Sequence, residues 1–226
     1  MRKGQRLKRI QARLTVENER DSTESGTIRL LERMLFFSDA VFAIVLTLLV
    51  LELRLPAGVT DARLFRGVLE LEPKLVAFAI TFALVAVFWI AHLSMMRRLN
   101  AFDWLVAWVN LFFLFTVTLT PFISTLLGEY SVFGNAWRLY CLALIAIGSA
   151  QFVLFLVIYR GHGRLIGGVG RREFWHRLIR AASPAASFAV LLALSLLGFT
   201  RISFILSFLI VPTILVLVGF SLSRRR

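Results

Sequence analysis

The sequence predicts an all-α polytopic membrane protein, with six transmembrane helices in a single repeat and both termini in the cytoplasm. Three observations support this fold class. Of the 226 residues, 58% are hydrophobic and 17% are charged, whereas soluble domains are about 45–50% apolar with about a quarter charged. The apolar residues gather in six stretches, each close to the ~20 residues that a helix needs to cross a bilayer. The basic residues lie mainly in alternate connections between those stretches.

Each stretch is predicted to be one helix of a single membrane domain over residues 33–223. Residues 1–32 are polar and poor in aromatic residues, which predicts a flexible cytoplasmic tail or a short surface helix. Residues 224–226 form a basic cytoplasmic end. No signal-peptide pattern precedes the first helix, so that helix is expected to be its own uncleaved insertion signal. The six helices are expected at 34–53, 75–96, 105–127, 136–158, 179–198 and 202–222.

Topology explains the formal net charge of +13. Twenty of the 26 Lys and Arg residues lie in the N-terminal tail, the second loop, the fourth loop and the C-terminal end. Cytoplasmic segments carry such an excess, so we expect a multi-pass protein of the plasma or inner cell membrane. Anionic lipid head groups near the tail are an expected partner. Nucleic acid is not, because no aromatic residue for base stacking is interleaved with the cations of the tail.

The sequence offers no catalytic or metal-binding set. Cys141 is the single cysteine, so neither an intrachain disulfide nor a cysteine metal cluster is possible. His162 and His176 lie in the fourth loop without neighbouring cysteines or clustered acids, which disfavours a metal site. The predicted helices lack a Ser-His-Asp set and paired carboxylates. We therefore expect no enzyme activity, no resident metal and no cofactor.

Asp39 is the informative polar residue of the first helix. A carboxylate at mid-bilayer costs about 2.5–3.5 kcal/mol on insertion scales, and less near the edge, so it normally has a partner. Arg33 lies on another face of the same helix and cannot pair with it. Trp89 and His92 share one face of the second helix, and Asn110 lies early in the third. We expect an Asp39–His92 contact, supported by the indole or the amide, that acts either as an interhelical clamp or as a proton relay.

A second face of the first helix is aliphatic. At about 100° per residue, Ile44, Phe37, Leu48, Leu51 and Thr47 fall within a stripe of about 100°, and the direction of Asp39 lies about 140° from Ile44. We refer to these five residues as the aliphatic stripe. The helix thus presents its carboxylate to the subunit interior and its stripe elsewhere. By itself, such a stripe is typical of plain packing or of contact with lipid.

These residues resemble a known signature. Arg33-x-x-x-Phe37-Ser38-Asp39, followed by Ala-Val-Phe-Ala-Ile and a Leu-rich helix ending in Glu52, is similar to the motif of the transmembrane protein 175 potassium-channel family. The likeness continues with Trp89-x-x-His92, with Asn110 and with Pro121-Phe122. It covers residues 33–127, and the last three predicted helices match only as hydrophobic segments.

The resemblance implies a potassium-selective channel whose permeant ion is potassium and whose pore is lined by the first helix of each subunit. One repeat per chain implies a homotetramer. Carried over, the hydrophobic constriction falls on Ile44, with Leu48 and Leu51 toward the exterior and a threonine ring at Thr47. Aliphatic rings of this kind gate by controlling wetting. The residues of the polar network that holds the pore helix would be Arg33, Ser38, Asp39, Trp89, His92 and Asn110.

A secondary transporter, coupled to protons or ions through Asp39 and His92, is the alternative. Such a transporter would need a polar site near the midplane and broken helices from an internal repeat. Asp39 lies toward the cytoplasmic edge, and no repeat is evident within the chain. A transporter also demands a coupled ion, whereas a channel passes potassium down its gradient alone.

Overall fold

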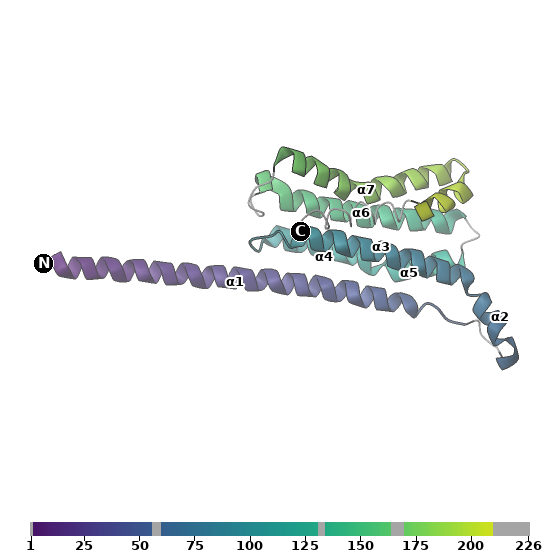
Figure 1. Ribbon diagram of the computed structural model, residues 1–226, viewed down its shortest axis with the longest axis horizontal. Coiled ribbons are helices and arrows are strands. Elements are labelled where there is room, and N and C mark those ends of the chain that lie inside the picture. Colours follow the sequence, from purple (N-terminus) through teal and green to yellow (C-terminus); the bar gives the residue numbers. More distant parts are fainter. Residues whose placement is uncertain (1, 56–59, 131–133, 164–169, 210–226) are drawn as a thin grey trace.

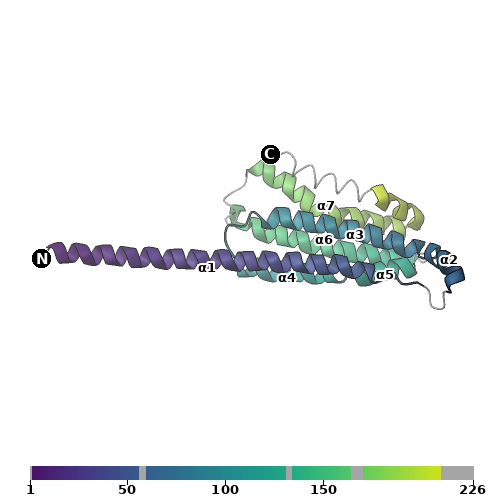
Figure 2. The same cartoon turned by 60° about the horizontal axis from the view of Figure 1, so that its bottom comes forward.

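The structure is a computed structural model that describes residues 2–55, 60–130, 134–163 and 170–209. All regular elements in these ranges are helices, which confirms the predicted all-α class. The long helices run side by side in one bundle (Figure 1, Figure 2). The elements are α1 (Arg2–Val50), the 3-10 turn η1 (Asp61–Arg63), α2 (Leu64–Leu69), α3 (Glu72–Met96), α4 (Trp104–Thr118), α5 (Thr120–Glu129), α6 (Gly134–Gly163), α7 (Arg171–Leu196) and a helix over Thr200–Leu209.

Five segments of the described chain are long and apolar enough to cross a membrane. They correspond to the first five predicted helices. The sixth, expected at 202–222, begins within the helix Thr200–Leu209, and its remainder lies outside the described residues. The five segments are Ser25–Val50, Glu72–Met96, Trp104–Glu129, Gly134–Arg160 and Arg171–Leu196.

The first helix is longer than the sequence predicts. A start near residue 34 is expected after a flexible or surface-helical tail, but α1 is continuous over its 49 residues, about 70 Å at 1.5 Å per residue. Its N-terminal part projects beyond the bundle (Figure 1). The first proline of the chain is Pro56, and residues of high helix propensity such as Arg, Lys, Gln, Glu and Leu dominate the N-terminal segment. Local propensity therefore extends the helix beyond its apolar part.

Prolines shape two of the membrane segments. The third predicted helix is broken at Leu119 into α4 and α5, because Pro121 has no N–H for the carbonyl of Val117. The Thr120 hydroxyl donates to that carbonyl oxygen at 2.8 Å instead. Pro184 lies inside α7, where the Ser183 hydroxyl donates to the carbonyl of Arg180 at 3.0 Å. Neighbouring hydroxyls thus satisfy backbone groups that the bilayer could not.

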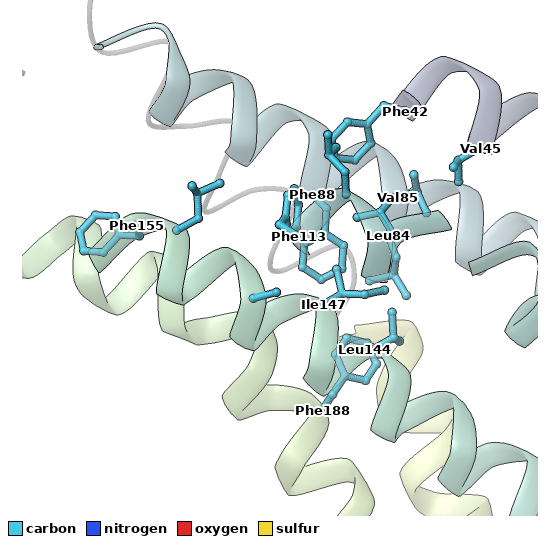
Figure 3. Packing of buried hydrophobic residues seen from close by; sticks show 14 of the residues in the cluster. Phe42, Val45, Leu84, Val85, Phe88, Phe113, Leu144, Ile147, Phe155 and Phe188 are labelled. Carbon is cyan, nitrogen blue, oxygen red and sulfur yellow. The ribbon is translucent and has the colours of Figure 1, made fainter. Parts of the chain in front are cut away.

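The core lies between α3, α4 and α6. Phe88 of α3, Phe113 of α4, Leu144 of α6 and Phe188 of α7 are each at most 2% exposed, and Figure 3 shows them converging with Phe42 of α1. The bundle is layered, with α1 on one side and α7 on the other (Figure 1). Helix α1 packs against α3, α4 and α5, whereas α6 and α7 form the most extensive helix pair. The edge position of α1 leaves one of its faces available to other molecules.

The α6–α7 pair depends on Gly148. A Cβ built at this position would lie 2.8 Å from the backbone nitrogen of Ala185, closer than real Cβ atoms approach. Gly148→Ala is therefore expected to push the helices apart and to lower the free energy of unfolding by about 1–3 kcal/mol. Gly26→Ala in α1 is the matched control, since nothing lies within 4 Å there and alanine raises helix propensity. Denaturant titration in detergent checks the pair, and equal stability of the two variants would contradict a close α6–α7 contact at Gly148.

Candidate functional site

The inner face of α1 attaches this helix to the bundle. Leu31, Ser38, Phe42, Val45 and Leu49 are each at most 7% exposed, at the three- and four-residue spacing of one helical face. The ring of Phe42 lies 5.6 Å from that of His92 and 6.0 Å from that of Phe113. These contacts fix the rotation of α1 about its own axis.

The aliphatic stripe lies on the outer side of α1. Ile44 and Leu51 are each 57% exposed, Phe37 is 52% exposed and Leu48 is 41% exposed. Thr47 is also exposed, and its hydroxyl donates to the carbonyl of Ile44 at 2.8 Å. That hydrogen bond occupies the proton and leaves the oxygen lone pairs of Thr47 available. The stripe therefore takes no part in the core of its own subunit.

A buried hydrogen-bond chain joins α1 to α3 and α4. Ser38, His92 and Asn110 are each at most 1% exposed. Asn110 Nδ2 donates to Ser38 Oγ at 2.9 Å, and Ser38 Oγ donates to the carbonyl of Met34 at 2.9 Å. Asn110 Oδ1 lies 2.8 Å from His92 Nε2, and an amide oxygen only accepts, so His92 is the donor in this arrangement. The chain clamps three helices at one level.

Asp39 has a different partner from the one expected. Trp89 Nε1 donates to Asp39 Oδ1 at 2.9 Å, while His92 turns to Asn110. The predicted Asp39–His92 contact is therefore wrong. Ser38 and Asp39 are adjacent residues whose side chains diverge by about 100° around the helix, so Ser38 meets Asn110 and Asp39 meets Trp89. The polar residues form two separate groups.

Arg33 stands apart from both groups. It is exposed on α1, and among the described residues the structure shows no ion pair between Arg33 and Asp39. Of the six residues expected in one network, the structure thus brings together Ser38, His92 and Asn110, and separately Asp39 and Trp89. Arg33 faces outward at the start of the membrane segment.

Other buried polar contacts were not singled out from the sequence. Thr81 and Tyr140 join α3 to α6 at 2.9 Å, and Gln151 Nε2 donates to the carbonyl of Phe88 at 3.0 Å. Trp137 Nε1 donates to Ser203 Oγ at 2.8 Å. The available signal was a polar residue within an apolar segment, since such groups need buried partners. These contacts hold the scaffold and lie away from the aliphatic stripe.

Asp39→Ala is expected to destabilise the fold through the loss of one partner. It leaves the Trp89 N–H without its acceptor, at a cost of about 1–3 kcal/mol in the free energy of unfolding. Asp39→Asn keeps an oxygen acceptor and should recover most of that loss. The yield of monodisperse protein in detergent and its unfolding midpoint measure both variants. An Asp39→Ala protein as stable as the native chain would contradict the assignment.

Comparison with known proteins relates the segment that contains the aliphatic stripe and the polar groups to a channel family. The family model described as "Endosomal/lysosomal potassium channel TMEM175" matches residues 33–121, which include the aliphatic stripe and both polar groups. The chain is 30% identical over 131 residues to a potassium channel of Chryseobacterium sp. (strain P1-3), covering 58% of this chain and 66% of that one. It is 28% identical over 218 residues to the endosomal/lysosomal proton channel TMEM175 of Rattus norvegicus, covering 89% of this chain and 42% of the relative.

A solved structure agrees in fold. The crystal structure of a lysosomal potassium-selective channel TMEM175 homolog from Chamaesiphon minutus superposes with a TM-score of 0.68 at 25% identity, covering 88% of this chain and 100% of that one. The aligned segments span less than two thirds of the length of the two curated relatives, 66% and 42%. The matched signature segment and the shared fold support membership of this chain in the TMEM175 family of ion channels.

Proposed function

We propose that this chain is a potassium-selective channel in which α1 of each subunit lines the pore. The observation that carries the proposal is the exposure of the aliphatic stripe on a helix at the edge of the bundle. Ile44 and Leu51 are each 57% exposed, yet the opposite face of α1 is anchored by the buried Ser38–Asn110 contact. A helix fixed in rotation with an outward apolar stripe suits a symmetric assembly about an axis.

A homotetramer is the proposed assembly, with four Ile44 side chains forming the narrowest ring. Leu48 and Leu51 would form further apolar rings toward the exterior. A narrow apolar ring excludes water and blocks ions until it widens, so these rings would gate the pore. The Thr47 oxygen, whose proton is donated to the Ile44 carbonyl, would offer lone pairs in place of part of the hydration shell of the ion.

The choice of potassium over protons rests on the arrangement of the titratable groups. The bacterial relative is named a potassium channel and the rat relative a proton channel. A proton path would need linked titratable groups, and here Asp39 and His92 bind different partners. The described side chains of Asp39 and His92 share no direct hydrogen bond, which also disfavours a transporter coupled through that pair.

The proposed setting is the cell membrane, with both termini in the cytoplasm. The chain ends, the α3–α4 turn and the α6–α7 loop carry most of the cations, as cytoplasmic segments do. The tail before the first membrane segment would attract anionic head groups. No cofactor, resident metal or nucleic acid is proposed, and potassium enters only as the permeant ion.

Flux into liposomes tests the proposed function. Vesicles loaded with potassium and diluted into a large impermeant cation should acidify only after a protonophore is added, since potassium efflux then draws protons inward. No acidification even with the protonophore would exclude a potassium conductance. Acidification on adding valinomycin without the protonophore would identify a proton conductance instead.

A further inference from the structure

The N-terminal part of α7 has two chemically different faces. On the inner face, Arg177 Nε and Nη2 donate to Glu173 Oε1 at 3.1 and 2.6 Å, and Arg177 Nη1 donates to the Tyr159 hydroxyl at 3.1 Å. Arg98 of the α3–α4 turn also reaches Glu173, at 3.5 Å. Glu173 is the one carboxylate of α7, so these inward contacts engage its negative charge.

The outer face of the same turns is cationic and then apolar. Arg171, Arg172 and His176 are exposed, and Trp175 and Ile179 are 52% and 64% exposed. These five residues share one side of the helix, because residues three and four apart are neighbours on a helix surface. We call them the α7 lipid face. Its arginines stand at the first residues of the membrane segment Arg171–Leu196, and its apolar members follow one and two turns farther in.

Positive charge at this end of the bundle exceeds what the nearby acids neutralise. Asp103 is bound by Arg160, and Glu173 by Arg98 and Arg177. Arg171 and Arg172 make no ion pair among the described residues. Guanidinium groups bind phosphate oxygens in a bidentate way, and a tryptophan beside them is typical of the head-group level of a bilayer.

We propose that the α7 lipid face binds an anionic phospholipid. Its phosphate would lie against Arg171 and Arg172, with His176 beside it, and an acyl chain would lie along Trp175 and Ile179. An apolar continuation below the cations selects a lipid rather than a free phosphate, which has no chain to bury. This inference depends on membrane insertion and not on ion conduction, so its failure would not affect the proposed channel function, and the reverse also holds.

Quenching of Trp175 by brominated lipid provides a local test. The full chain is placed in phosphatidylcholine nanodiscs with a minor fraction of lipid brominated on its acyl chains, either phosphatidylglycerol or phosphatidylcholine. The contribution of Trp175 is the difference from Trp175→Phe. We expect brominated phosphatidylglycerol to quench that contribution at a lower mole fraction than brominated phosphatidylcholine does. Equal quenching by the two lipids would overturn the proposal.

Charge variants distinguish lipid binding at the α7 lipid face from a general attraction of anionic lipids to exposed cations. The double variant Arg171→Gln/Arg172→Gln should weaken the preference for phosphatidylglycerol over phosphatidylcholine roughly thirtyfold. Each cation near the membrane surface contributes about 1 kcal/mol, and each 1.4 kcal/mol corresponds to about a tenfold change in affinity. Arg63→Gln/Arg201→Gln removes two exposed cations at the other end of the bundle and should keep the preference. An equal loss in both variants, or reversal of the quenching by millimolar inorganic phosphate, would contradict a lipid site on α7.

Discussion

Replacing Ile44 by asparagine is expected to reduce the potassium-to-sodium permeability ratio by about tenfold or more, equivalent to ~1.4 kcal/mol of discrimination. Ile44 is 57% exposed on the anchored pore helix of the proposed channel. An amide in the narrowest ring would keep water in the constriction and let hydrated ions pass with less selection. Reversal potentials in mixed potassium and sodium solutions measure the ratio.

The matched control is Ile205→Asn. Ile205 is 63% exposed in the helix Thr200–Leu209, so the substitution changes a comparable isoleucine away from α1. Its permeability ratio should equal that of the native chain. Equal ratios in the native chain and in Ile44→Asn would place the selective step elsewhere and remove Ile44 from the constriction.

Asn110→Ala is expected to be the most destabilising of the substitutions considered. It removes the acceptor of His92 and the donor to Ser38 together, and both of these partners are at most 1% exposed. His92 loses its acceptor, whereas Ser38 loses one donor and keeps its hydrogen bond to the Met34 carbonyl. With about 1–3 kcal/mol for the unsatisfied group and about 1 kcal/mol for the other lost hydrogen bond, the free energy of unfolding should fall by about 2–4 kcal/mol. Unfolding by denaturant in detergent micelles measures the change.

Asn100→Ala provides the comparison for that variant. Asn100 is an exposed asparagine between α3 and α4, and its loss should change the free energy of unfolding by less than about 0.5 kcal/mol. Partial rescue is expected from Asn110→Gln, which keeps both amide functions on a longer side chain. Asn110→Ala as stable as Asn100→Ala would mean that the hydrogen-bond chain does not hold α1.

The sequence predicted the fold class and much of the helix layout because both depend on local composition. The length of the apolar stretches located five membrane segments that the structure confirms. The orientation predicted from the distribution of cations stays a prediction. Spacing also placed Trp89 and His92 on one face of α3, and both meet residues of α1 or α4. Periodicity assigns a residue to a face, and an unpaired polar residue in an apolar segment demands a partner.

Partner identity was not predictable in the same way. The expected Asp39–His92 contact is wrong because two α3 residues and one α4 residue compete for Ser38 and Asp39, and only the three-dimensional arrangement of the helices decides among them. The break at Leu119 and the length of α1 also differ from the expectation. The apolar pattern runs through Pro121 without a gap, so it does not reveal the break. In α1 the apolar pattern covers only the C-terminal part, whereas helix propensity is high in the polar N-terminal part as well.

Cross-linking through a single introduced cysteine tests most directly whether copies of α1 meet at Ile44. Cys141 is fully buried, so we expect disulfides between subunits to form only through the added cysteine. Ile44→Cys and Val190→Cys replace side chains of nearly equal exposure, 57% and 59%, on α1 and on α7. On oxidation in the membrane, the Ile44→Cys protein should form disulfide-linked dimers and the Val190→Cys protein should stay monomeric on a gel. Dimers from Val190→Cys alone, or none from Ile44→Cys, would contradict a pore lined by α1.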